Sequence, residues 1–301
     1  MARLVSRKED GPIDGYLFRN WNRAVSDMIA ASDGAALLDA LVGGLDNLAP
    51  LDSWMAALFR RGAGPVVFGY AVPDGKPDRY GDGPFLLDPF YDAFTKGLGP
   101  GCFLLEDLAP DNFRKSEFYQ TYYRRFAFID EAGYLIPLDT ATTAHLSLSR
   151  SRYRSRFSPA EVASLRDVIP VVEGVFRRLW AWRRDGALGQ AGGAADSTDL
   201  EAALSDFGTS DLTARERDIG RLVLRGHSAK AIAARLDIAP GTVRTHIKSI
   251  YAKLGVSSQA ELFSVFIDQI LRHAARRASA TVQATRRRAP TTGHAPEQAD
   301  S

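Results

Sequence analysis

The sequence predicts an α+β protein in two parts: an N-terminal antiparallel sheet with helices on both sides (α/β/α), then an all-α domain of four helices. Two observations carry this prediction. Strand-like alternation is mixed with amphipathic runs in the first half, and short helical patterns separated by turn residues fill the last third. The expected units are a folded domain over 1–185, a flexible Gly- and Ala-rich linker over 186–210, a helical domain over 211–271, and a basic disordered tail over 272–301.

Composition excludes several classes of protein. With 45% hydrophobic and 25% charged residues, the chain resembles ordinary globular proteins. No run approaches the roughly 18 apolar residues of a membrane span, and residues 1–15 lack the apolar run of a signal peptide, so we expect a cytoplasmic protein with no membrane partner. The single cysteine, Cys102, can form neither an internal disulfide nor a zinc site alone, and we expect no metal and no cofactor.

Charge is distributed unevenly along the chain. Residues 1–150 carry 15 Lys and Arg against 20 Asp and Glu, whereas residues 211–301 carry 15 against 8. A basic C-terminal third indicates a polyanion-binding end, although an Arg-rich solvated surface gives the same asymmetry. Arg286, Arg287 and Arg288 in the tail either add non-specific attraction to phosphates or are simply solvated.

Helices and strands follow one another in the first half. Amphipathic helices are expected over Tyr16–Ala31, with Ile29 among its apolar residues, and over Asp33–Leu48, where Asp33 is a candidate N-cap. The expected strands, antiparallel and buried on one face, are Ser53–Arg60, Pro65–Val72, Ala132–Leu138 and Thr143–Ser149.

The segment Ser158–Arg184 has the strongest helical pattern of this half. Ser158, Pro159 and Glu161 form a helix start with a capping box. The apolar residues behind it cover two faces of one long helix. This pattern predicts either one broad core face or a helix shared between its own sheet and a second subunit.

The C-terminal domain has the parts of a helix-turn-helix. The second and third helices are separated by a turn at Asp237 to Ala239, and Gly255 follows the third helix as an expected terminator. Thr213 and Glu216 form a capping box at the start of the first helix. The four expected helices are Thr213–Gly226, Ser228–Leu236, Pro240–Leu254 and Ser258–Leu271.

The third helix has two distinct faces. Arg244, Thr245 and Lys248 point away from its apolar stripe. Such a face suits the DNA major groove, because Arg can read guanine through two hydrogen bonds and a Thr methyl can contact thymine. The inward stripe consists of Val243, Ile247, Ile250 and Leu254.

The motifs Leu212–Glu216, Gly226–Ala233 and Thr242–Val256 closely resemble the DNA-binding domain of the LuxR family of bacterial transcription regulators. The resemblance implies that the third helix enters the major groove of double-stranded DNA and that the fourth pairs in a DNA-bound homodimer. It also implies roles for individual positions: Arg244, Thr245 and Lys248 face the groove, Ser228 and Lys230 start the scaffold helix, and Thr242 contacts a phosphate.

Three positions depart from the usual family pattern. Ala239 stands where Ser or Thr is usual, so the third helix lacks a side-chain cap worth about 1 kcal/mol, which Pro240 partly offsets. Ala229 replaces a common Asn, and Gln259 replaces a common Arg. These two changes affect individual contacts with the DNA backbone.

The first half resembles, less specifically, the GAF- or PAS-like sensory domains of such regulators, through Ser116–Tyr119, His145–Leu148 and Phe157–Glu161. It lacks the acidic pair of a phosphoacceptor receiver and any Walker loop, and its Trp and Tyr spacing does not match acyl-homoserine-lactone receptors. The resemblance implies a sensory domain that controls DNA binding.

Aromatic residues are abundant in the middle of the chain and belong either to a core or to a pocket. His145 is either a polar anchor in a cavity or an exposed histidine at a sheet edge. We hypothesise a small-molecule cavity on the sheet. Its candidate lining residues are Trp54, Tyr70, Tyr134 and His145.

Two other classes of function compete with a DNA-binding regulator. An enzyme would draw on residues such as His145, Ser147, Ser149, Asp139 and Cys102, but no nucleophile elbow, metal cluster or phosphate loop frames them, so we expect no enzyme. An interaction protein would dock a partner through its first half and would have lost specific DNA binding. The missing cap at Ala239 is the feature that favours this alternative.

Overall fold

The structure, a computed structural model, describes residues 15–72, 80, 84–184, 207–269 and 272. Its sheet has the strand order β2-β1-β5-β4-β3, and every neighbouring pair is antiparallel. The strands are β1 (Ser53–Arg60), β2 (Ala63–Ala71), β3 (Gly101–Leu104), β4 (Phe128–Pro137) and β5 (Thr142–Ser151). The predicted antiparallel sheet is confirmed, with β3 as a short edge strand that the sequence pattern did not reveal.

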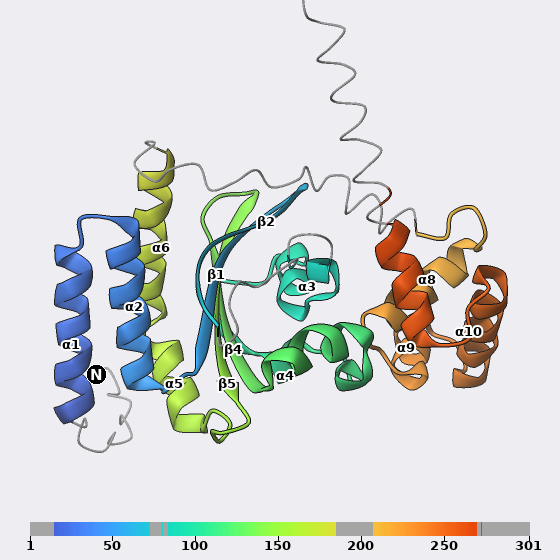
Figure 1. Cartoon of the computed structure of the whole chain (residues 1–301), viewed down its shortest axis with the longest axis horizontal. Coiled ribbons are helices and arrows are strands. Elements are labelled where there is room, and N and C mark those ends of the chain that lie inside the picture. Colours follow the sequence, from blue (N-terminus) through green and yellow to red (C-terminus); the bar gives the residue numbers. More distant parts are fainter. Residues whose placement is uncertain (1–14, 73–79, 81–83, 185–206, 270–271, 273–301) are drawn as a thin grey trace, which may run out of the picture.

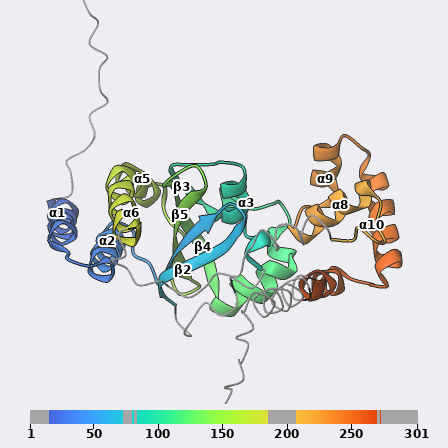
Figure 2. The ribbon, with the colours of Figure 1, turned by 90° about the horizontal axis from the view of Figure 1, so that it is seen from above.

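Helices cover both faces of the sheet, as Figures 1 and 2 show. The helices on one face are α1 (Gly15–Ala30), α2 (Gly34–Leu48), α5 (Pro159–Asp167) and α6 (Ile169–Arg184). The other face is covered by α3 (Pro89–Thr95), α4 (Leu105–Leu108) and short helical turns between residues 84 and 126. The predicted α/β/α arrangement is therefore confirmed.

The outermost helix, α1, is only partly covered. Asp33 caps the next helix, accepting a hydrogen bond from the Ala36 N–H at 2.9 Å, as predicted. In α1 the buried side is formed by Ala24 and Met28, and Ile29 is 73% exposed because it lies about a third of a turn away from them. Ile29, although one of the apolar residues of the predicted amphipathic helix, is therefore not part of its buried side.

Both faces of the sheet are buried, whereas the sequence predicted one. All ten residues of β5 are buried, including Thr143, His145 and Ser147 on its polar side. The His145 ring lies 4.9 Å from the ring centres of both Phe59, on which it stacks, and Phe90, to which it is tilted. β5 is the central strand, so His145 is not an edge histidine, and burial lowers its pKa to about 4.

The long helix predicted over 158–184 is two helices. The capping box of Ser158 and Glu161 is present, but α5 ends at Asp167 and Val168 leaves the helical conformation. Pro170 explains the break, because it has no N–H to donate to the carbonyl four residues earlier and its ring crowds that carbonyl. The half-buried Val171 and Trp182 pack against the same core as the buried residues of α6, which favours the single broad core face.

Most of the predicted linker and tail lie outside the described residues, including Arg286, Arg287 and Arg288. At the end of the predicted linker, Phe207 is fully buried and meets Phe266 edge-on, with ring centres 5.4 Å apart. The core of the C-terminal helices therefore contains a residue that precedes the predicted domain start at 211. None of the helices in the described part of the chain has the length and apolarity that crossing a membrane requires.

Candidate nucleic-acid interface

The C-terminal region contains the predicted helix-turn-helix. Its helices are α8 (Ala214–Leu224), α9 (Ala229–Leu236) and α10 (Pro240–Leu254), followed by a helix over 259–269. Asp237 makes the turn between α9 and α10 with a left-handed φ of 52°, and Gly255 ends α10 with a φ of 66°. These local features match the prediction.

One side of α10 is packed into the C-terminal core. Val243 and Ile250 are at most 1% exposed, and Ile247 and Leu254 are half-buried against the same cluster. This is the inward stripe that the sequence predicted. The cluster also contains buried residues from the other helices: Ile219, Ile232, Leu262 and Phe266.

The opposite side of α10 is open. Arg244, Thr245 and Lys248 are exposed, as is Thr242 at the start of the helix. The Thr245 hydroxyl donates a hydrogen bond to the Gly241 carbonyl at 3.1 Å. α10 lies at the end of the molecule farthest from the sheet, so the sheet domain does not cover this face (Figure 1).

A buried carboxylate connects α8 to α10. Glu216 accepts hydrogen bonds from the Thr213 N–H at 2.8 Å, from the Ser249 hydroxyl at 2.7 Å and from the Lys253 ammonium at 2.7 Å. The bond from Lys253, together with those from Thr213 and Ser249, lowers the pKa of Glu216 to about 2. Sequence reasoning found the capping box of Thr213 and Glu216 but not the link to α10, which joins residues 33 and 37 positions apart.

The start of α9 is the second part of the candidate interface. Ser228 is the N-cap residue and its hydroxyl accepts a hydrogen bond from the Ala231 N–H at 3.2 Å, while Lys230 is exposed. The free N–H groups and positive dipole of a helix start favour a phosphate. Ser228 also contacts Asp111 of the sheet domain.

The structure shows what Ala239 and Gln259, two of the departures from the family pattern, do in the fold. Ala239 makes no side-chain cap at the start of α10, as expected, and Pro240 occupies the first turn. Gln259 donates its side-chain amide to the Val223 carbonyl at 2.9 Å, so it ties the last helix to α8. The Gln259 side chain thus helps to hold the C-terminal helices together.

The four ligand-binding candidates do not come together. The Trp54 ring and Tyr134 pack with the core on the side of α2 and α6, where the Tyr134 hydroxyl donates to the Leu165 carbonyl at 2.8 Å. His145 lies on the other face, and Tyr70 is 38% exposed on the edge strand β2. Successive side chains of a strand point to opposite faces of the sheet, so candidates on neighbouring positions are placed on different faces.

A small cavity of about 70 Å³, lined mainly by apolar side chains with a few buried polar groups, lies on the His145 side of the sheet. Burial raises the pKa of Glu131 to about 8 and that of Asp88 to about 6. The Tyr80 hydroxyl donates to Asp88 at 2.6 Å, and the Ser147 hydroxyl donates to Glu131. Trp54 borders this cavity. Its acidic groups are not predictable from the sequence, because nothing local marks Glu131 as buried.

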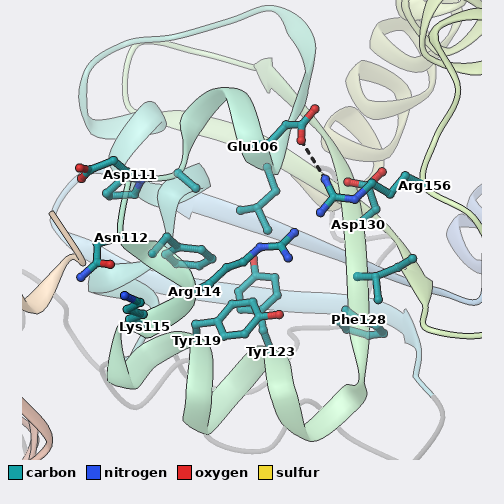
Figure 3. A pocket seen from close by; sticks show the side chains of 15 residues that line it. Glu106, Asp111, Asn112, Arg114, Lys115, Tyr119, Tyr123, Phe128, Asp130 and Arg156 are labelled. Atoms are coloured by element: carbon teal, nitrogen blue, oxygen red, sulfur yellow. Dashed lines mark hydrogen bonds and ion pairs between the residues drawn. The ribbon is translucent and has the colours of Figure 1, made fainter. Parts of the chain in front are cut away.

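A larger cavity of about 330 Å³ lies between α4, the turn over 110–115 and the start of β4. Arg114, Tyr119 and Tyr123 reach into it, and the ion pair of Glu106 with Arg156, 2.9 Å long, stands at its rim (Figure 3). Tyr123 borders both cavities.

Of the residue types that would suit an enzyme, Cys102 and Asp139 lie apart from His145, Ser147 and Ser149 on β5. Cys102 is buried on the side of the sheet opposite to His145, and burial raises its pKa to about 12. Asp139 lies in the turn between β4 and β5, where it accepts a hydrogen bond from the Ala141 N–H at 2.8 Å. The structure does not combine them into one site.

Comparison with known proteins gives a consistent set of relatives. The family described as "Bacterial regulatory proteins, luxR family" matches residues 210–266. The chain is 35% identical over 188 residues to a protein of Aeromonas salmonicida whose name describes an HTH-type transcriptional regulator, covering 61% of this chain and 95% of that one. It is 51% identical over 49 residues to the transcriptional regulatory protein NarL of Mycobacterium tuberculosis, covering 16% of this chain and 23% of that one.

Two solved structures are similar to parts of the chain. The LBD domain of VqsR from Pseudomonas aeruginosa is 28% identical with a TM-score of 0.49, covering 54% of this chain and 97% of that one. Escherichia coli SdiA is 16% identical with a TM-score of 0.43, covering 84% of this chain and 98% of that one.

Replacing Glu216→Ala is expected to destabilise the C-terminal helices by about 2–3 kcal/mol, because it removes a buried charged acceptor and with it the hydrogen bonds from Thr213, Ser249 and Lys253. The contribution of the carboxylate is present above its unfolded pKa near 4.5 and is lost as the pH falls toward about 2. Hydrogen exchange of the α8 and α10 amides in the full chain measures the effect at neutral and acidic pH.

The matched control is Glu261→Ala, which removes an exposed carboxylate that accepts from the Ser257 N–H at 2.7 Å in the same region. Its expected cost is about 1 kcal/mol or less. Equal losses for the two variants would contradict the structural role assigned to Glu216.

Proposed function

Because the chain belongs to the LuxR family of bacterial transcription regulators, we propose that it binds double-stranded DNA sequence-specifically through α10. In this proposal residues 211–271 form the DNA-binding domain and residues 1–185 the sensory and dimerisation domain. Arg244, Thr245 and Lys248 read the major groove. The residues that contact the DNA backbone are Thr242, Ser228 and Lys230.

The observation that carries the proposal is the two-sided character of α10. Val243 and Ile250 pack one side of the helix into the core. The cations Arg244 and Lys248 are exposed on its other side. A helix that enters a groove needs both properties, since its packed side sets its orientation and its open side reaches base edges.

Arg244→Ala is expected to weaken the preference for one base pair about tenfold, because a bidentate contact to guanine supplies about 1–3 kcal/mol of discrimination. Lys248→Ala is expected to weaken binding whichever group it contacts, and a phosphate contact would also lower the salt slope by about one. Selection from random duplexes followed by fluorescence anisotropy at several salt concentrations measures both effects.

The control variant is Arg177→Ala, which removes an exposed cation from α6 and leaves the C-terminal helices untouched. If Arg244→Ala and Lys248→Ala bind and select DNA like Arg177→Ala, α10 is not the reading helix.

We further propose that the sheet domain senses a small molecule in the cavity beside Glu131. Glu131, Asp88, Tyr123 and Ser147 supply buried hydrogen-bonding groups around it, surrounded by aromatic residues. A few convergent polar groups in an apolar setting are typical of ligand sites. The raised pKa of Glu131 favours its protonated form at neutral pH, which suits an uncharged ligand with hydrogen-bonding groups.

Two phenols allow a matched test of this cavity. In a thermal-shift screen of uncharged amides, lactones and phenols, Tyr123→Phe is expected to reduce the shift given by a binding compound, because the Tyr123 hydroxyl faces Glu131. Tyr134→Phe also removes one buried hydroxyl but on the opposite face, and it should keep the shift. Equal effects of both variants, or no shift in the unaltered chain, would contradict the proposal.

The proposed regulator is a homodimer, because two helix-turn-helix units reading neighbouring half-sites bind DNA as a pair. The outer side of α1 supports this: Phe18 and Ile29 are 53% and 73% exposed and lie eleven residues apart, on one side of the helix. Large apolar side chains aligned on an outer helix favour burial against a second copy.

Ile29→Asp is expected to convert the dimer into a monomer at micromolar concentration, as measured by analytical ultracentrifugation, because a charge would be buried in the interface. Tyr153→Asp is the control, since Tyr153 is 82% exposed in the turn after β5, away from α1. A dimer that survives Ile29→Asp, or an unaltered chain that is monomeric, would exclude this interface.

A further inference from the structure

The start of α9 is held by the turn that follows α4 in the sheet domain. The Asp111 carboxylate accepts hydrogen bonds from both the N–H of Ser228, at 2.9 Å, and the hydroxyl of Ser228. The Asn112 N–H donates to the Gly226 carbonyl at 3.1 Å. Three hydrogen bonds therefore join two neighbouring residues of this turn to the segment just before α9.

Charge and close packing strengthen the same contact. Arg225 forms an ion pair with Asp92 of α3 at 2.9 Å, and the two side chains are only 25% and 19% exposed. Gly226 has a φ of 92°, and a Cβ there would lie 3.0 Å from both Phe113 Cα and Ser116 Cβ. The backbone at Gly226 thus rests directly on the sheet domain, and its positive φ together with this close approach favours glycine at the position.

This contact engages the groups that a DNA phosphate would use. The N–H and hydroxyl of Ser228, at the positive end of α9, are suitable donors for a phosphate oxygen. Both already donate to the Asp111 carboxylate, which is an anion as well. A phosphate at Ser228 would have to replace this carboxylate, since the donors are shared and the two anions repel each other.

We propose that Asp111 acts as an internal competitor of the DNA backbone, so that the contact between residues 111–112 and residues 226–228 must open before α9 engages a phosphate. The proposal rests on the proposed function, in which Ser228 contacts the DNA backbone. The groove face of α10 stays exposed in the closed arrangement. The contact therefore restrains backbone binding at α9 while leaving the base-reading side chains free.

The first test is the affinity of the full chain for a random-sequence duplex, measured by fluorescence anisotropy. Asp111→Ala is expected to bind about three- to tenfold more tightly than Asp107→Ala, because it removes the competing carboxylate. Asp107→Ala is the matched control: it removes the same charge from an exposed residue of α4 whose ion pair is with Arg166 in the sheet domain. General repulsion between protein and DNA therefore changes equally in both variants.

The second test needs no DNA. Hydrogen exchange at the Ser228 amide is expected to be severalfold faster in Asp111→Ala and unchanged in Asp107→Ala, because Asp111 is its acceptor. Equal duplex affinities of the two variants, or unchanged exchange at Ser228, would overturn the proposal. Loss of duplex binding by the unaltered chain and both variants would contradict the proposed function instead, and exchange would still report whether the contact forms.

Discussion

The carboxylate of Glu216 determines how the C-terminal helices present their charged face. It lies at the start of α8 and accepts hydrogen bonds from Ser249 and Lys253 on α10. Together with the packing of Val243 and Ile250, these bonds hold α10 in one rotation about its own axis and so set which side chains point outward. The apolar residues Val243 and Ile250 bury the inward side, and Arg244 and Lys248 are left on the open side as a consequence.

Sequence reasoning was most successful where the signal is local. The helix starts at Asp33, Ser158 and Thr213 and the end of α10 at Gly255 were all predictable, because an N-cap or a left-handed glycine acts within a few residues. The inward stripe of α10 follows from helical periodicity alone. The break caused by Pro170 is equally local. It was not predicted, because the apolar pattern continues across Pro170 and indicated one long helix.

What the sequence could not predict depends on contacts between distant segments. The polar side of β5 alternates like a solvated face, and it is buried because residues 84–126 fold over it. The same folding surrounds Glu131 and places Asp111 beside Ser228, 117 residues away in the chain. The segment that carries Asp111 also lines the larger cavity, so this cavity and the start of α9 are joined through one turn (Figure 3).

A structure of the full chain bound to a selected duplex tests the central claim most directly. The account predicts α10 in the major groove, with Arg244 and Lys248 at the DNA and the bonds of Glu216 to Ser249 and Lys253 intact. Two copies of α10 should lie about 34 Å apart along the duplex. A complex in which α10 faces away from the DNA, or in which α10 reaches the groove only after separating from Glu216, would contradict the account.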